Sequence, residues 1–147
     1  MLKNKGILFK MINYLLKKPS LEEYKKLRNC VDWNLESKGI DEKRAIDSLE
    51  ICPLCVCAYD DEEIVGMVRL SGDLGMYGYI QDTIVMPTYQ GKGIGKKMME
   101  MILEALKNKK GYLLGVCPSK TSVQFYEKFG FKKRPEDPNG FMSMEFQ

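Results

Sequence analysis

The stretch "QGKGIGKK" at positions 90–97 combines three glycines with three lysines, just ahead of a long amphipathic pattern. Small residues leave backbone N–H groups uncovered, and the apolar spacing that follows predicts a helix beginning in this stretch. Unpaired N–H groups and the positive end of a helix dipole attract anions. The stretch therefore predicts a loop that binds a phosphate or pyrophosphate. The alternative is that its glycines only make a tight turn between a strand and a helix.

Two common phosphate-binding motifs do not fit this loop. A P-loop needs glycine at its first position and Ser or Thr after the lysine, where the chain has Gln90 and Lys97. The dinucleotide fingerprint needs a third glycine three residues after the second, and Lys96 stands there. Neither a magnesium-dependent nucleotide site nor a dinucleotide site is expected.

Other chemistry is limited by what the chain contains. It has no histidine, which excludes Ser-His-Asp triads, Cys-His dyads and histidine-ligated metals. Cys52, Cys55 and Cys57 lie close together and raise the possibility of a metal or redox site. Without histidine or a second cysteine pair, we interpret them as small apolar residues of a strand and expect no metal.

Hydrophobic periodicity predicts an α/β fold in which the strands form one mixed sheet and the helices pack against it. The order strand, long helix, strand after position 76 predicts a right-handed crossover between parallel strands. Ser20 with Glu23 forms a capping box at the start of the first helix. In chain order we expect a strand within 7–15, helices beginning at Ser20 and Asp41, two strands within 54–72 and one at 76–86, a helix after 93, a strand at 111–117, a helix from Ser119 or Thr121 through Phe129, and strands at 131–133 and 141–146.

Size and charge narrow the class of protein. A chain of 147 residues with 44% hydrophobic and 29% charged residues is expected to fold as a single domain, residues 1–147. A net charge of +3 without a basic block predicts no nucleic-acid partner. The chain has no apolar run of about 20 residues and no signal-peptide pattern, so we expect a cytoplasmic protein without a membrane partner.

Two motifs then resemble a known family. The Gln-x-x-Gly-x-Gly loop after a Val-x-Pro strand end resembles the acyl-CoA pyrophosphate loop of the GNAT superfamily of N-acetyltransferases. Downstream, "SVQFYEKFGF" at 122–131 resembles that family's late-helix motif. The resemblance implies a central mixed sheet that splays between two strands, and acetyl-CoA as co-substrate. It implies that these residues bind the cofactor: Ile84, Val85, Gln90, Gly91, Lys92, Gly93, Ile94, Gly95, Lys96, Ser119, Ser122 and Lys128.

The resemblance also implies how the reaction would proceed. An amine attacks the thioester directly, a backbone N–H near the strand break stabilises the oxyanion, and an acid protonates the leaving thiolate. Tyr126 occupies the position of that acid, although its spacing also suits a core aromatic. The strand expected at 76–86 presents Tyr77, Tyr79, Gln81 and Thr83 on one face, and none of them is a good base at neutral pH.

Asp82 is the only acid in that strand. It is expected either to hold the substrate ammonium or relay its proton through water, or to serve as a structural carboxylate that caps a neighbouring turn. Trp33, Tyr79, Gln81 and Asp82 are the expected substrate-binding residues.

These features predict an N-acetyltransferase that acts on a small amine or an amino terminus, as a monomer or a homodimer. The alternative is a non-catalytic acyl-CoA-binding module that has the fold but not the reaction.

Overall fold

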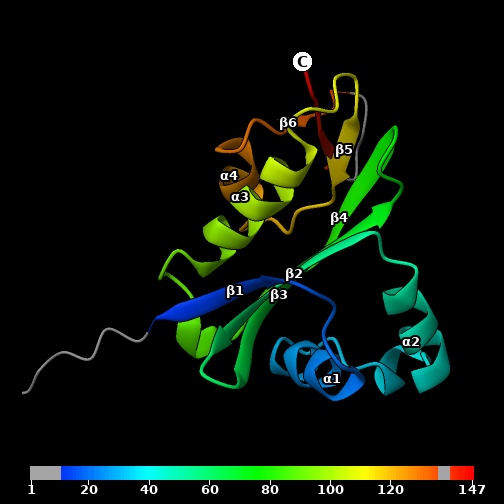
Figure 1. The fold of residues 1–147 in the computed structure, drawn as a ribbon, viewed down its shortest axis with the longest axis vertical. Helices are drawn as coiled ribbons and strands as arrows, with labels where there is room; N and C mark the ends of the chain where they lie inside the picture. The colour runs from blue at the N-terminus through cyan, green and yellow to red at the C-terminus, as the bar shows by residue number, and fades with distance from the viewer. Residues whose placement is uncertain (1–10, 136–139) are drawn as a thin grey trace, which may run out of the picture.

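A seven-stranded mixed sheet runs through the molecule in the order β1-β2-β3-β4-β5-β7-β6, with helices on both of its faces (Figure 1). The computed structural model describes residues 11–135 and 140–147. The strands are β1 Ile12–Leu16, β2 Leu54–Asp60, β3 Glu63–Gly72, β4 Tyr77–Val85, β5 Leu113–Val116, β6 Lys132–Lys133 and β7 Met142–Glu145. The helices are α1 Leu21–Cys30, α2 Glu42–Glu50, α3 Ile94–Leu106 and α4 Val123–Glu127, with short 3₁₀ turns η1 Glu36–Lys38 and η2 Pro87–Tyr89.

The sheet separates two apolar cores because neighbouring strand residues point to opposite faces. In β2, Val56 and Ala58 pack in the core that α3 covers. Cys55, Cys57 and Tyr59 pack in the other core, with residues of α1 and α2. The sequence prediction of an α/β fold around one mixed sheet is thus confirmed.

Local sequence signals set the starts of the first two helices. Ser20 accepts a hydrogen bond from Glu23 N, and the Glu23 side chain accepts one from Ser20 N, which completes the predicted capping box. Asp41 accepts a hydrogen bond from Arg44 N at the start of α2. Both helices therefore begin where the sequence predicted.

The last helix is shorter than predicted. The helix α4 begins at Val123, and its N-cap residue Ser122 makes no side-chain capping bond. Ser119 instead lies 2.9 Å from Ser122 through their hydroxyl oxygens, so these side chains bond each other rather than the helix amides. The first strand begins at Ile12, and the part of its predicted range before residue 11 lies outside the described residues.

The strands β4 and β5 form the parallel pair of the sheet, and their pairing is short. It runs from Tyr77 with Leu113 to Ile80 with Val116, whereas β4 continues to Val85. Among the residues that the structure describes, the second half of β4 therefore has β3 on one side and no strand on the other. This is the splay implied by the family resemblance.

A β-bulge lies at that point of β4. Met67 pairs with Ile84 and Arg69 with Gln81, so Asp82 and Thr83 lie opposite the single residue Val68. Asp82 has φ of 48°, a left-handed conformation that aspartate tolerates better than most residues. Such a bulge bends the strand and reverses the side-chain alternation after it.

Candidate active site

Two neighbouring cavities follow the open half of β4. The first has a volume of about 640 Å³ and lies between β4, the end of β5 and α4. The second, about 920 Å³, lies over the glycine loop and the start of α3. Five residues line both, which makes them one continuous groove: Thr83, Val85, Gln90, Ser122 and Phe125.

The glycine loop presents free backbone donors to the second cavity. Gly91 and Gly93 have φ of 75° and 80°, and a Cβ built on either would meet no atom within 4 Å. The first hydrogen bond of α3 runs from Lys97 N to Gly93 O, at 3.0 Å. Within the described residues, the N–H groups of 91–96 donate no hydrogen bond to protein. Donors in this arrangement suit a diphosphate.

The lysines of the loop differ in their positions. Lys96 and Lys128 line the second cavity, where Lys96 is 3.9 Å from Glu100. Lys92 does not line it; its ammonium lies 5.2 Å from the centre of the Tyr89 ring. Positive charge beside the groove therefore comes most directly from Lys96 and Lys128.

The open edge of β4 carries polar groups suited to a hydrogen-bonding ligand. Gln90 donates from its side-chain amide to Val85 O at 3.0 Å, which fastens the loop to the end of the strand. The Thr83 hydroxyl oxygen is buried, and its neighbour is the Tyr126 phenol. It places a polar group beside Tyr126 at the open edge of the strand. These features fit the pantetheine arm and diphosphate of coenzyme A.

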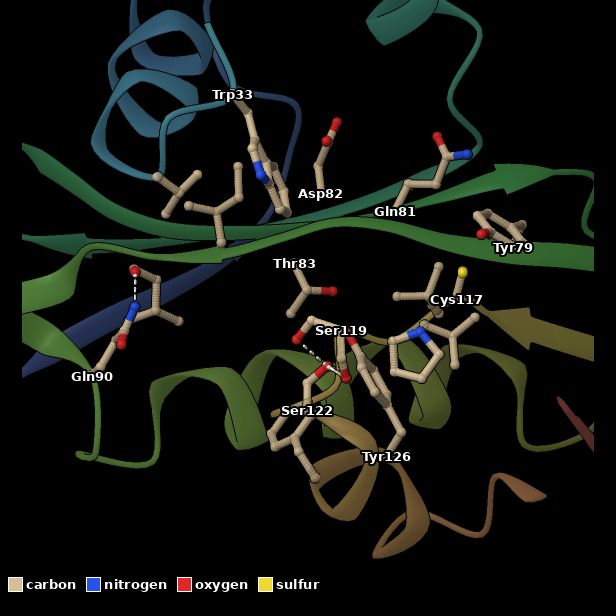
Figure 2. A pocket seen from close by; sticks show the side chains of 17 residues that line it. Trp33, Tyr79, Gln81, Asp82, Thr83, Gln90, Cys117, Ser119, Ser122 and Tyr126 are labelled. Atoms are coloured by element: carbon tan, nitrogen blue, oxygen red, sulfur yellow. Dashed lines mark hydrogen bonds between the residues drawn. The ribbon is translucent and has the colours of Figure 1, made fainter. Parts of the chain in front are cut away.

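Tyr126 reaches the first cavity from α4 (Figure 2). Its ring is buried among core residues, with 5% of the residue exposed. Burial raises the pKa of Tyr126 above the ordinary value of 10.0, while the nearby Thr83 hydroxyl acts in the opposite direction. The phenol therefore keeps its proton at neutral pH and is available as a proton donor.

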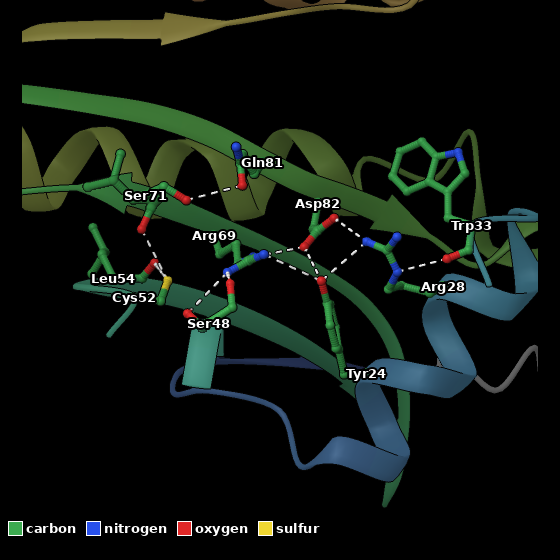
Figure 3. A network of polar contacts seen from close by, with 11 residues as sticks. Tyr24, Arg28, Trp33, Ser48, Cys52, Leu54, Arg69, Ser71, Gln81 and Asp82 are labelled. Atoms are coloured by element: carbon green, nitrogen blue, oxygen red, sulfur yellow. Dashed lines mark hydrogen bonds and ion pairs between the residues drawn. The ribbon is translucent and has the colours of Figure 1, made fainter. Parts of the chain in front are cut away.

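Asp82 lies at the centre of a buried polar network (Figure 3). Its Oδ1 accepts a hydrogen bond from Arg28 Nη1 at 3.1 Å. Its Oδ2 accepts from Arg69 Nε at 2.8 Å and from the Tyr24 hydroxyl at 2.5 Å. The Asp82, Arg28 and Arg69 side chains are only 9–10% exposed. The structure thus places Asp82 in a buried ion-pair network, whereas the structural alternative expected from the sequence was a carboxylate that caps a neighbouring turn.

The bulge corrects one expectation about β4. Tyr77, Tyr79, Gln81 and Thr83 were expected on one face of the strand. Figure 2 shows Gln81 and Asp82 projecting from the side of β4 that faces α1, and Thr83 projecting toward Tyr126. The prediction was wrong for Thr83 because the inserted residue shifts the alternation at Asp82.

The cavities bring together nearly all of the expected site residues. The first cavity is lined by Trp33, Tyr79, Gln81, Asp82, Ile84, Ser119 and Tyr126, and the second by Gly91, Gly93, Ile94, Gly95, Lys96 and Lys128. Gln90, Val85 and Ser122 line both, and Lys92 lines neither. Phe125 lines both cavities but was not among the expected site residues. Sequence reasoning also missed Arg28 and Arg69, since no sequence pattern connects them with Asp82.

The cysteines lie away from this groove, except for Cys117. Cys52, Cys55 and Cys57 are buried in the core beneath α1 and α2, and Cys57 donates to Lys17 O at 3.2 Å. A hydrogen bond that the Cys55 thiol donates to Cys57, together with burial, raises the pKa of Cys55. No group of three His, Cys, Asp or Glu side chains suited to a metal occurs within residues 11–135 and 140–147. No helix in these ranges is long and apolar enough to span a membrane.

A mixed sheet that opens between two parallel strands, beside a glycine-rich helix start, is the arrangement expected of an acyltransferase with a GNAT fold. Comparison with known proteins confirms this class. The sequence model of the Acetyltransferase (GNAT) family matches residues 19–131, most of the chain. The chain therefore belongs to the GNAT acetyltransferase family.

Individual relatives agree at moderate identity. The chain is 31% identical over 80 residues to the GCN5-related N-acetyltransferase 2, chloroplastic, of Arabidopsis thaliana. The matched region covers 54% of this chain and 31% of that protein. It is 38% identical over 55 residues to the glucosamine 6-phosphate N-acetyltransferase of Trypanosoma brucei brucei, covering 37% of each. The chain thus spans about a third of the length of these curated relatives.

Solved structures show the same fold over almost the whole chain. A protein of unknown function from Staphylococcus aureus, described as a probable acetyltransferase, matches with a TM-score of 0.73 and 27% identity over 88% of this chain and 95% of that one. The PaiA N-acetyltransferase of Thermoplasma acidophilum, solved with coenzyme A, matches with a TM-score of 0.72 and 17% identity over 91% and 99%. At that identity the second likeness concerns the fold alone.

Proposed function

We propose that this protein transfers the acetyl group of acetyl-CoA to a primary amine of a small molecule or an amino terminus, by direct attack in a ternary complex. The observation that carries the proposal is the continuous groove. It joins free amides at the start of α3 to the unpaired edge of β4 and then to the Tyr126 phenol. These three features match, in order, the diphosphate, the pantetheine arm and the thioester of acetyl-CoA.

The donor side of the groove would act through backbone groups and Tyr126. The amides of 91–96, with Lys96 and Lys128, would hold the diphosphate. The free edge of β4 would bond the pantetheine amides as an added strand does. Bound acetyl-CoA supplies an activated acyl group, and a β4 amide near the bulge would stabilise the oxyanion.

The acceptor side explains how transfer can proceed without a dedicated base. Asp82 is engaged by Arg28, Arg69 and Tyr24 and is therefore not proposed as the proton acceptor. An amine bound in its neutral form beside the thioester gains most of its rate from proximity and orientation. Tyr126 would give its proton to the departing thiolate, and the proton lost by the attacking nitrogen would return to the Tyr126 phenolate, directly or through water, so that no separate base is consumed.

The test uses the full chain with acetyl-CoA and a panel of primary amines, following release of free thiol and, separately, the Kd of acetyl-CoA. Binding together with amine-dependent release of thiol supports the proposal. Binding without turnover on any amine would instead favour the non-catalytic acyl-CoA-binding module. If acetyl-CoA does not bind at all, both functions are excluded.

A further inference from the structure

Trp33 is an exposed aromatic side chain inside a concave site. It is 41% exposed and yet lines the first cavity. Figure 2 shows its indole reaching toward β4 from the turn that follows α1, on the same side of the strand as Asp82. Large apolar side chains that remain exposed within a cavity commonly contact ligands.

The backbone that carries Trp33 is held firmly. Trp33 N donates to Arg28 O at 2.9 Å, and Arg28 Nε donates to Trp33 O at 2.8 Å. Arg28 is itself 8% exposed and ion-paired with Asp82 (Figure 3). The turn also contains Asp32, with φ of 60°. The indole is thus presented by a fixed turn, which lowers the entropy lost when a ligand binds.

The charges around the cavity favour an apolar ligand body. Of the described residues that line it, only Asp82 has a charged side chain, and donors already engage both of its oxygens. A carboxylate or phosphate on the acceptor would lose its hydration and find no free counter-charge among these residues.

A second aromatic residue lies further along β4. Tyr79 lines the same cavity and stacks on Phe141, with ring centroids 5.8 Å apart and planes 14° apart. Phe141 in turn occupies the space beside Gly115, where an added Cβ would lie 2.3 Å from the ring. The acceptor side is therefore bordered by two positioned aromatic rings.

We propose that Trp33 determines acceptor specificity, and that the acceptor is an amine joined to a planar apolar body which packs against the indole. Arg28 is the positioning residue that holds the Trp33 turn against the Asp82 network. This inference rests on the proposed function for the identity of the reacting group, but the binding of the apolar body can be measured without turnover.

The binding experiment uses the chain's single tryptophan as a probe. The full-length protein is saturated with coenzyme A and titrated with 2-phenylethylamine, ethylamine or glucosamine 6-phosphate while the fluorescence of Trp33 is recorded. We expect 2-phenylethylamine to change the emission and to bind at least about tenfold more tightly than ethylamine, as expected for an added aromatic contact. Equal affinities, or a preference for glucosamine 6-phosphate, would overturn the proposal.

Variants then separate a specific role from a structural one. In acetyl transfer, Trp33→Ala is expected to lower kcat/KM on the order of tenfold for 2-phenylethylamine but little for ethylamine. Trp33→Phe should recover most of the loss, and the Kd of acetyl-CoA should not change. Leu74→Ala is the matched control, because Leu74 is 42% exposed and lines neither cavity.

The outcomes distinguish the two proposals. An equal loss for both amines in Trp33→Ala, or no loss, refutes the specificity role while leaving acetyl transfer intact. Selective binding of 2-phenylethylamine without any acetylation refutes the proposed function and supports the aromatic subsite.

Discussion

Replacing Asp82 with asparagine tests whether this carboxylate is structural or catalytic. Asparagine keeps the size of the side chain and tolerates the left-handed backbone at φ of 48°. It removes the charge that neutralises Arg28 and Arg69, whose side chains are 10% and 9% exposed. Removing one partner from a buried ion pair typically costs about 3–5 kcal/mol. We expect a loss of that size in the free energy of unfolding.

The assay is urea and thermal unfolding of wild type and variant. For a chain of this size each kcal/mol shifts Tm by about 2–4 °C, so Tm should fall by about 6–20 °C. Asp47→Asn is the matched control, since Asp47 pairs with Lys43 on the surface and its side chain is 54% exposed. That variant should change stability by less than about 1 kcal/mol.

A different result would restore Asp82 as a catalytic base. In that case Asp82→Asn would keep its Tm within about 2 °C of wild type, and kcat would fall by about 10²-fold or more. The acidic limb of the pH profile of kcat/KM would also disappear. This combination would refute the structural assignment.

Three further predictions concern the groove and the sheet. Gly93→Asp places a negative charge at the proposed diphosphate site. For unit charges about 5 Å apart the repulsion is about 1–3 kcal/mol. The Kd of acetyl-CoA should therefore rise about 5- to 150-fold. Gly93→Asn, which also tolerates the φ of 80°, should leave most of the affinity, and equal effects of the two variants would exclude an electrostatic role. Tyr126→Phe should lower kcat about 10²-fold without changing the Kd of acetyl-CoA. Because burial raises the pKa of Tyr126 above the ordinary value of 10.0, the phenol stays protonated to higher pH, and any alkaline decline in wild-type kcat should be centred above that ordinary value. A decline centred near neutral pH would argue against this acid. Gly78→Ala would place a Cβ 2.1 Å from the Tyr112 hydroxyl and should lower the free energy of unfolding in urea by about 1–3 kcal/mol. Gly75→Ala is the control and should be neutral, because no atom would lie closer than 3.4 Å to its Cβ. A neutral Gly78→Ala would show that strands β3 and β4 adjust at little cost.

Elements encoded by local signals could be predicted from the sequence. The capping box at Ser20, the cap at Asp41 and the long apolar face of α3 each depend on residues three or four apart. The glycine loop was predicted as an anion site for the same reason, because three glycines and a helix start lie within one short stretch.

The bulge and the buried network could not be predicted in this way. Asp82 takes a left-handed conformation because Met67 and Arg69 on β3 pair with residues on either side of it. Arg28 precedes Asp82 by 54 residues, and arginine and aspartate are residue types that usually lie on the surface of a protein. Only the tertiary fold brings a residue of α1, one of β3 and one of β4 together, so the electrostatic role of Asp82 depends on contacts that no local pattern encodes.

Tyr126 shows that a core residue and a reactive residue can be the same side chain. Its ring makes edge-to-face contacts with Phe125, at 5.0 Å and 79°, and with Phe131, at 5.6 Å and 78° between ring planes. These contacts bury the ring while the residue still lines the first cavity, and burial also raises the pKa that keeps the hydroxyl protonated. A proton donor must be held to within a fraction of an ångström, and a short helix such as α4 cannot supply that precision alone. The packing of Tyr126 in the core is therefore a condition for the acid role, and the helical spacing that suggested a core aromatic is consistent with both.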